Sequence, residues 1–108
     1  MPTDTATKQS KQVLLGNLRC FNLRLKQPLL VLIERNEKEF VCDCPDVDIY
    51  GVGDTEQEAI VDFSENLEDF FYLLKKEGEK KLGKQMIHIW RFLETIIEET
   101  DATESKAS

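Results

Sequence analysis

The spacing of apolar residues changes once along the chain, near residue 55. Between residues 21 and 26, three apolar side chains alternate with three polar ones, which predicts a strand with one face in water. The apolar residues of this segment are Phe21, Leu23 and Leu25. Gln27-Pro28 then ends the strand, because proline lacks the backbone N–H that a sheet needs.

Residues 29–35 and 38–44 predict a β-hairpin that turns at Asn36-Glu37. With that short turn, one face carries Leu29, Val31 and Ile33 together with Phe40, Cys42 and Cys44. A turn longer by one residue would instead pair Glu34 with Lys38. In the short-turn register the opposite face is apolar too, with Leu30, Leu32 and Val41. We expect a second helix to cover that face, and a partner subunit is the alternative.

From Glu56 onwards the apolar period becomes helical. The first stripe, at spacings of three and four, is Ile60, Phe63, Leu67, Phe70, Phe71 and Leu74. Gly78 follows Lys75-Lys76 and is placed to end this helix. A second helix is predicted over about residues 84–99, with the stripe Met86, Ile89, Trp90, Leu93, Ile96 and Ile97.

These elements predict one α+β domain over residues 11–100, a three- or four-stranded, mainly antiparallel sheet packed by two helices. Residues 1–10 and 101–108 are polar without periodicity, and we expect both to be disordered tails. A net charge of −7 argues against unaided binding to nucleic acid and suits a basic partner. The chain shows no apolar segment long enough for a membrane, so we expect a soluble cytoplasmic protein with free thiols.

The segment Gly51–Ile60, "GVGDTEQEAI", resembles a phosphate-binding loop at first sight. No third glycine or lysine follows, however, and Asp54 would place a negative charge where a phosphate should sit. Thr55-Glu56-Gln57-Glu58 instead matches a capping box, in which the Thr55 hydroxyl accepts from the backbone of Glu58 and the Glu58 carboxylate reaches back. The segment is therefore predicted to be the corner where the sheet leads into the helix.

No metal, cofactor or catalytic site is predicted. The acidic residues at the corner do not fit an EF-hand loop; they are Asp43, Asp46, Asp48 and Asp54. A zinc site would need Cys20 and His88 to converge on Cys42 and Cys44, and we expect buried cysteines instead. His88 and Ser64 lie on different helices with no motif joining them, so we do not expect an enzyme.

Four carboxylates at spacings of four, three and four form one stripe on the first helix, called here the acidic stripe: Glu58, Asp62, Glu65 and Asp69. Like charges one turn apart destabilise a helix slightly, so the stripe offers the fold little. It is either an ordinary solvent-exposed face of the helix or a docking surface for a basic protein. If it docks a partner, we expect the binding anchors to be Tyr50 and the exposed strand edge.

The segment from Pro28 to Lys76 resembles the HicB-like antitoxin family. The motif residues are Cys44-Pro45-Asp46-Val47 and then Gly53-Asp54-Thr55 with Glu58-Ala59. The resemblance implies a compact α+β fold, described as a partial ribonuclease-H-like fold without a nuclease site. It also implies a protein that neutralises a small basic RNA-cleaving toxin. The family's Pro-Gly-Cys is here Asp48-Ile49-Tyr50, and the strand that the family has after the helix is absent.

The chain thus resembles a short, stand-alone member without a C-terminal DNA-binding domain. Our leading hypothesis is a non-catalytic protein–protein interaction domain of the antitoxin type, and the alternative is a structural or oligomerising module with no toxin partner. A homodimer or higher homo-oligomer is expected, because the hairpin has a second apolar face.

Overall fold

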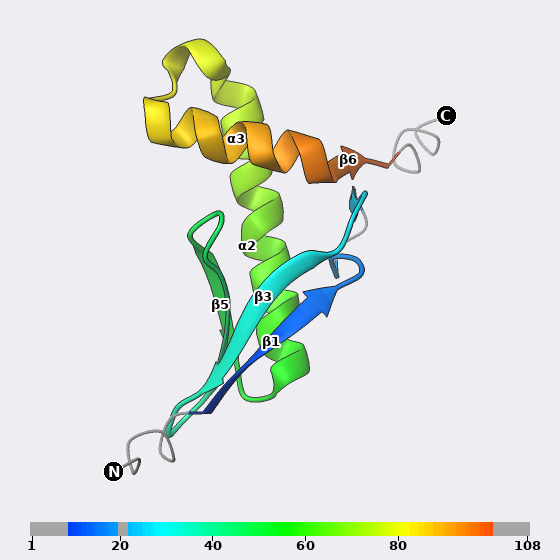
Figure 1. The fold of residues 1–108 in the computed structure, drawn as a ribbon, viewed down its shortest axis with the longest axis vertical. Helices are drawn as coiled ribbons and strands as arrows, with labels where there is room; N and C mark the ends of the chain where they lie inside the picture. The colour runs from blue at the N-terminus through cyan, green and yellow to red at the C-terminus, as the bar shows by residue number, and fades with distance from the viewer. Residues whose placement is uncertain (1–8, 20–21, 101–108) are drawn as a thin grey trace.

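The computed structural model describes residues 9–19 and 22–100. Its elements are, in order, β1 (Gln9–Leu15), β2 (Leu23–Leu25), β3 (Leu29–Arg35), β4 (Phe40–Cys44), β5 (Ile49–Gly53), α2 (Glu56–Glu77), a short 3-10 turn η1 (Glu79–Lys81), α3 (Lys84–Ile96) and β6 (Ile97–Glu99). Four strands form an antiparallel sheet in the order β1-β3-β4-β5, and β2 pairs with β6 in a separate two-stranded sheet. The α+β class is therefore confirmed, with four strands in the main sheet (Figure 1).

The hairpin of β3 and β4 keeps its predicted faces but not its predicted pairing. Ile33 pairs with Cys42 and Arg35 with Phe40, so the connection spans residues 36–39 rather than two residues. The side-chain amide oxygen of Asn36 fixes this turn by accepting from the backbone of Lys38 and Glu39, each at 2.9 Å. The pairing is displaced by two residues, and two residues is the period of a strand, so the same side chains face inward.

Two strands of the main sheet were not predicted. β1 begins at Gln9, so the disordered tail expected through residue 10 is too long by two residues; residues 1–8 and 101–108 lie outside the described part of the chain. β5 occupies the segment that we predicted to be a corner. Its pairing with β4 runs from Cys44–Ile49 to Phe40–Gly53.

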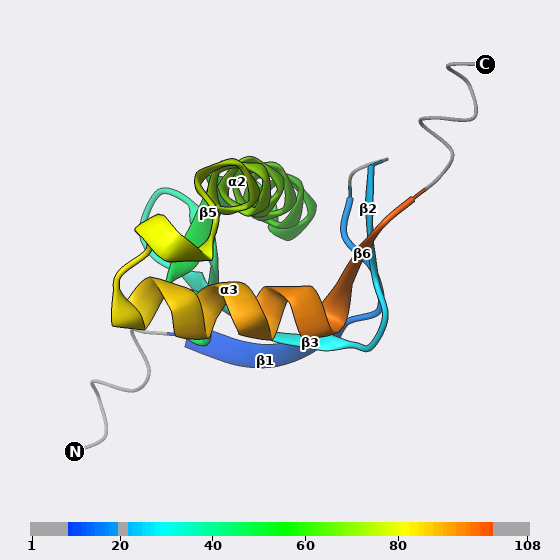
Figure 2. The ribbon, with the colours of Figure 1, turned by 90° about the horizontal axis from the view of Figure 1, so that it is seen from above.

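Helix α2 covers the inner face of the sheet and runs along β5 and β4 (Figure 2). The predicted stripe is buried except for Phe70, which is only partly buried, and Ala59 and Ser64 join it. Its partners on the sheet are the inward residues Leu15, Leu29, Val31, Ile33, Cys42 and Cys44. The helix ends as predicted at Gly78, whose φ of 80° suits glycine and whose N–H donates to the carbonyl of Leu74 at 3.0 Å.

Helix α3 does not cover the second face of the sheet, which corrects our expectation. It crosses one end of α2 and leads into β6, as Figures 1 and 2 show, and it buries Ile89, Trp90, Leu93 and Ile96. Trp90 packs on Phe71 with ring centroids 5.2 Å apart. Met86, which we assigned to the apolar stripe of this helix, is 39% exposed.

The outer face of the sheet, directed away from α2, consists of alternate residues of all four strands. They are Ser10, Gln12 and Leu14 on β1, Leu30, Leu32 and Glu34 on β3, Val41 and Asp43 on β4, and Tyr50 and Val52 on β5. Leu14 is 66% exposed, Tyr50 61% and Leu30 40%, and no helix of the described chain lies across this face. The predicted second apolar face therefore exists and is uncovered.

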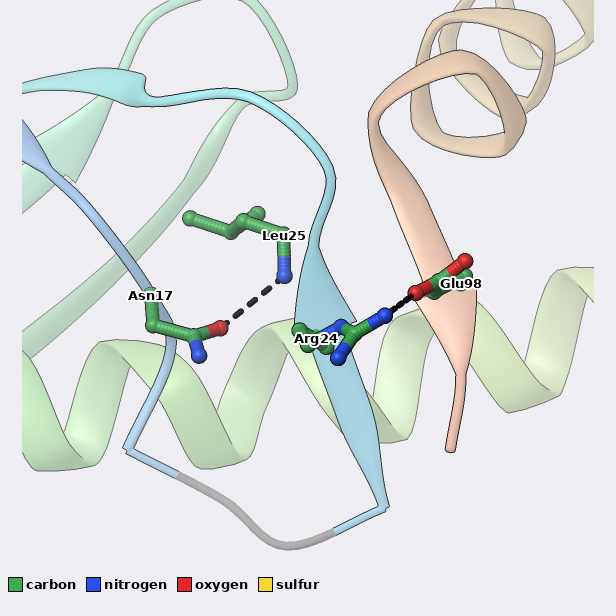
Figure 3. Close-up of polar contacts among 4 residues, drawn as sticks. All are labelled: Asn17, Arg24, Leu25 and Glu98. Carbon is green, nitrogen blue, oxygen red and sulfur yellow. Dashed lines mark hydrogen bonds and ion pairs between the residues drawn. The ribbon is translucent and has the colours of Figure 1, made fainter. Parts of the chain in front are cut away.

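The small sheet joins β2 to β6, the strand that directly follows α3. Leu23 and Leu25 are buried and Arg24 is exposed, as the alternation predicts, while Phe21 lies outside the described residues. The side-chain oxygen of Asn17 accepts from the backbone N–H of Leu25 at 2.9 Å, and Arg24 pairs with Glu98 (Figure 3). The chain turns back after β1, so that β2 lies beside β6. We call this two-stranded sheet the clasp.

Candidate functional site

The motif residues of the corner are placed by the chain's passage from β4 through β5 into α2. Pro45 and Asp46 lie exposed in the four-residue turn between β4 and β5, where Val47 and Asp48 both donate to the carbonyl of Cys44. Asp48 has a φ of 60°, a left-handed conformation in which Asp and Asn are enriched. These motif residues shape the turn.

The capping box is confirmed. The Thr55 hydroxyl accepts from the backbone N–H of Glu58 at 3.1 Å, and the Glu58 carboxylate accepts from the backbone N–H of Asp54 at 2.9 Å. The first bond satisfies a donor that a helix start leaves unpaired, and the second holds the residue before the N-cap. The charge of Glu58 also lies at the positive end of the helix dipole, which favours it there.

Two glycines of β5 allow α2 to approach the sheet backbone closely. A Cβ added at Gly51 would lie 2.1 Å from the backbone nitrogen of Phe63, and one added at Gly53 would lie 2.6 Å from the backbone nitrogen of Ala59. Gly51 and Gly53 both project from the inner face towards the helix. Ala59, a motif residue with no exposed surface, is small for the same reason. The glycines thus serve helix packing.

The acidic stripe divides into residues committed to the fold and residues that face water. The Asp62 carboxylate accepts from the backbone N–H of Val52 at 2.9 Å, and Asn66 donates its side-chain N–H to the carbonyl of Tyr50 at 2.9 Å. These two side chains bond to the outward backbone groups of β5, which is one of the two edge strands of the main sheet. Glu65 and Asp69 are exposed on the same helix.

The structure brings the acidic stripe together with apolar side chains that sequence reasoning did not select. A shallow hollow between α2 and β5 is lined by Val52, Gly53, Gln57, Glu58, Val61, Asp62 and Glu65. Val61 of α2 is exposed beside these carboxylates. Tyr50, on the same strand as Val52, projects onto the outer face of the sheet. The spacing of the stripe alone gave no signal for Val52 or Val61, since β5 was not predicted as a strand.

Further acidic residues, Asp43 with Glu34 and Asp48, lie close together near the outer face of the sheet. Burial raises the pKa of the Asp43 carboxyl, and the nearby charges of Glu34 and Asp48 raise it further. Asp43 pairs across the sheet with Tyr50, so its charge lies beside the exposed ring. These carboxylates repel one another, and their negative charges would attract a cation placed here.

The other candidates from the sequence do not come together. Cys42 and Cys44 are buried free thiols; burial, then Cys44 and Asp43, raises the pKa of Cys42 to about 12, and burial raises that of Cys44 to about 11. Ser64 is buried, donates to the carbonyl of Ile60 at 2.9 Å and accepts from the N–H of Arg19 at 3.0 Å. His88 is exposed on α3, and Cys20 lies outside the described residues.

Within residues 9–19 and 22–100 there is no group of three or more Cys, His, Asp or Glu side chains that could hold a metal ion. None of the helices in that same part combines the length and apolar character that crossing a membrane requires. The candidate site is the surface formed by the acidic stripe, Val52, Val61 and Tyr50, and we call it the acidic surface.

Comparison with known proteins adds no relative. No protein-family model, no curated protein and no solved structure matches this chain.

Proposed function

We propose that this chain is a non-catalytic protein-interaction domain of the HicB-like antitoxin type, which binds a small basic protein through the acidic surface. The observation that carries the proposal is the arrangement of that surface. Exposed carboxylates of Glu58 and Glu65 line the same hollow as the exposed side chain of Val61, and the exposed Tyr50 lies on the adjoining strand β5. Apolar anchors surrounded by complementary charge are the usual composition of a protein interface.

Electrostatics supports the same choice of partner. The chain has a net charge of −7, and the nearby charges of Glu34 and Asp48 add to burial in raising the pKa of Asp43. A basic partner would relieve that repulsion, whereas a nucleic acid would add to it. The resemblance of the corner motif to HicB-like antitoxins adds an RNA-cleaving toxin as the specific class of basic protein.

The test begins with the genes beside the one for this chain, where the proposal expects a gene that encodes a small basic protein. We expect the two purified proteins to associate and the complex to cleave messenger RNA more slowly than the basic protein alone. Tyr50→Ala and Val61→Ala should weaken the association, while Leu73→Ala, an exposed leucine elsewhere on α2, should not. If no such gene adjoins this one, or if the pair does not associate, the antitoxin proposal is wrong.

A second candidate function is a structural or oligomerising module with no toxin partner. The observation that favours it is the uncovered outer face, where Leu14 and Leu30 are exposed side by side on paired strands. Normal messenger RNA cleavage by the basic protein in the presence of this chain, together with self-association, would select this alternative.

A further inference from the structure

The two edge strands of the four-stranded sheet differ in whether other residues hydrogen-bond to their outward backbone groups. At β5, Asp62 and Asn66 of α2 bond to the backbone groups that point away from β4. At the opposite edge, β1 pairs with β3 on one side, and no hydrogen bond from another described residue reaches its backbone on the other side. One edge is closed and one is open.

Of the features that keep an edge strand from pairing, β1 has one charged side chain but neither a proline nor a bulge. Its register with β3 runs without interruption from Gln9–Arg35 to Leu15–Leu29, and its sequence, QSKQVLL, contains no proline. Its one charged side chain, Lys11, pairs with Glu56 at the start of α2 at 3.0 Å and is thereby drawn over the inner face. A long, regular edge without a proline or bulge remains available to another strand when its one charge is engaged elsewhere.

An exposed apolar surface adjoins this edge. Leu14 of β1 and Leu30 of β3 are cross-strand neighbours on the outer face, and they are among the exposed large hydrophobic residues. A strand added beyond β1 would cover the open side of Leu14. Backbone pairing and apolar burial would then act at the same place.

We propose that β1 pairs antiparallel with β1 of a second copy of this chain, so that two main sheets become one continuous sheet. The charge distribution selects a second copy. β1 contains no acidic residue, and the acidic stripe borders the opposite edge of the sheet. Two chains that each carry a net charge of −7 therefore repel less when they meet at β1 than when they meet at β5.

The sequence of β1 is compatible with pairing to itself. With a two-fold axis at Gln12, the middle residue of the strand, Gln12 meets its own copy, Lys11 faces Val13, and Ser10 faces Leu14. No like charges lie opposite each other in this register, and residues of the outer face stay together on one side. The pairing uses neither Tyr50 nor the acidic stripe, so it is independent of the proposed basic partner.

A charge-swap experiment tests this pairing. Gln12 is exposed, so Gln12→Glu and Gln12→Lys should leave the fold of each copy intact, which thermal melts verify. We expect the parent protein to sediment as a dimer, and each variant alone to dissociate at concentrations several-fold higher than the parent, because like charges then face each other across the axis. Mixing the two variants should restore a dimer, seen by native mass spectrometry as a species containing one copy of each.

Gln85, exposed on α3, supplies the control: Gln85→Glu and Gln85→Lys change the net charge equally and should dimerise as the parent does. A parent protein that is monomeric at high micromolar concentration would overturn the proposal. So would a dimer that the Gln12 variants leave unchanged, since that dimer would form elsewhere. Association of the Gln12 variants with the basic protein reports separately on the proposed function.

Discussion

The Asp62 carboxylate accepts a hydrogen bond from the backbone N–H of Val52, ten residues earlier in the chain, and thereby holds the edge strand β5 to helix α2. A residue that the sequence offered as part of a docking stripe thus has a structural role. Asp62→Ala should destabilise the fold by about 1–2 kcal/mol, because a partly buried N–H loses a charged acceptor. Denaturant melts measure this.

The matched control for that variant is Asp69→Ala, which removes an exposed carboxylate two turns further along α2. Its unfolding midpoint should change little. Amide hydrogen exchange supplies a local readout: Val52 should exchange faster in Asp62→Ala and at the parent rate in Asp69→Ala. Equal midpoints for the two variants would show that the cap on β5 contributes nothing.

Gly51→Ala should be the most damaging small substitution in the chain. The new Cβ would lie 2.1 Å from the backbone nitrogen of Phe63, so α2 would have to move away from β5. We expect a loss of stability of about 3 kcal/mol or more, at the upper end of overpacking effects. Gly16→Ala is the control, since nothing lies within 4 Å of its Cβ position, and its melt should resemble that of the parent.

Thr55→Ala should lower stability by about 1 kcal/mol, because it removes the acceptor for the backbone N–H of Glu58. Thr55→Ser keeps an oxygen at that position and should recover most of the loss. Urea titrations of the three proteins decide the matter. A serine variant as weak as the alanine variant would assign the effect to the lost methyl group.

The thiols of Cys42 and Cys44 should resist modification in the folded protein. Burial holds both pKa values well above that of a free thiol, at about 12 and about 11, so neither forms the reactive thiolate near neutral pH. In a Cys20→Ser background, a thiol reagent at about pH 8 should label only unfolded chains. Rapid labelling without denaturant would contradict the burial of β4.

The same shifts fix the sign of a pH dependence. Each thiol has a higher pKa in the folded state than in the unfolded state, where the ordinary value is 9.0. The unfolded chain therefore loses these protons first as the pH rises, and the stability contributed by the neutral thiols is lost between pH 9.0 and about 12. Unfolding midpoints measured across this window should fall more in the parent than in Cys42→Ala, relative to the value of each at neutral pH.

Association with a basic partner should depend on salt and on the water-facing part of the acidic stripe. Glu65→Lys combined with Asp69→Lys should slow association several-fold at low ionic strength, and added salt should reduce the difference. The control double variant, Glu37→Lys with Glu94→Lys, changes the net charge equally at exposed positions in the β3–β4 turn and on α3. Equal association rates for both double variants would mean that only the overall charge matters.

The helices and the hairpin faces were predictable because their apolar periods are long and regular. β5 was not, because its sequence IYGVG contains two glycines, which are depleted in strands and suggested a turn. The reason for those glycines is the close approach of α2, a tertiary contact with no local signature. β6 was missed since Ile97 continues the apolar stripe of α3 by one further residue.

Much of the candidate site depended on the same missed strand. Thr55 and Glu58 were assigned correctly because a capping box is local in sequence. The role of Asp62 required knowledge that Val52 has an outward backbone N–H, and therefore that β5 is an edge strand. The apolar outer face was foreseen from the alternation of Leu30, Leu32 and Val41, but it is uncovered because the helix expected to cover it packs elsewhere.

The clasp between β2 and β6 has a consequence for how the chain reaches its native state. Arg24 and Glu98 are 74 residues apart, so their pairing closes a loop that includes most of the domain. Closing so long a loop is entropically costly unless the intervening chain has already folded. The four-stranded sheet and α2 should therefore form first, and β6 should dock on β2 as a late step. During translation, that step waits until the final strand has left the ribosome.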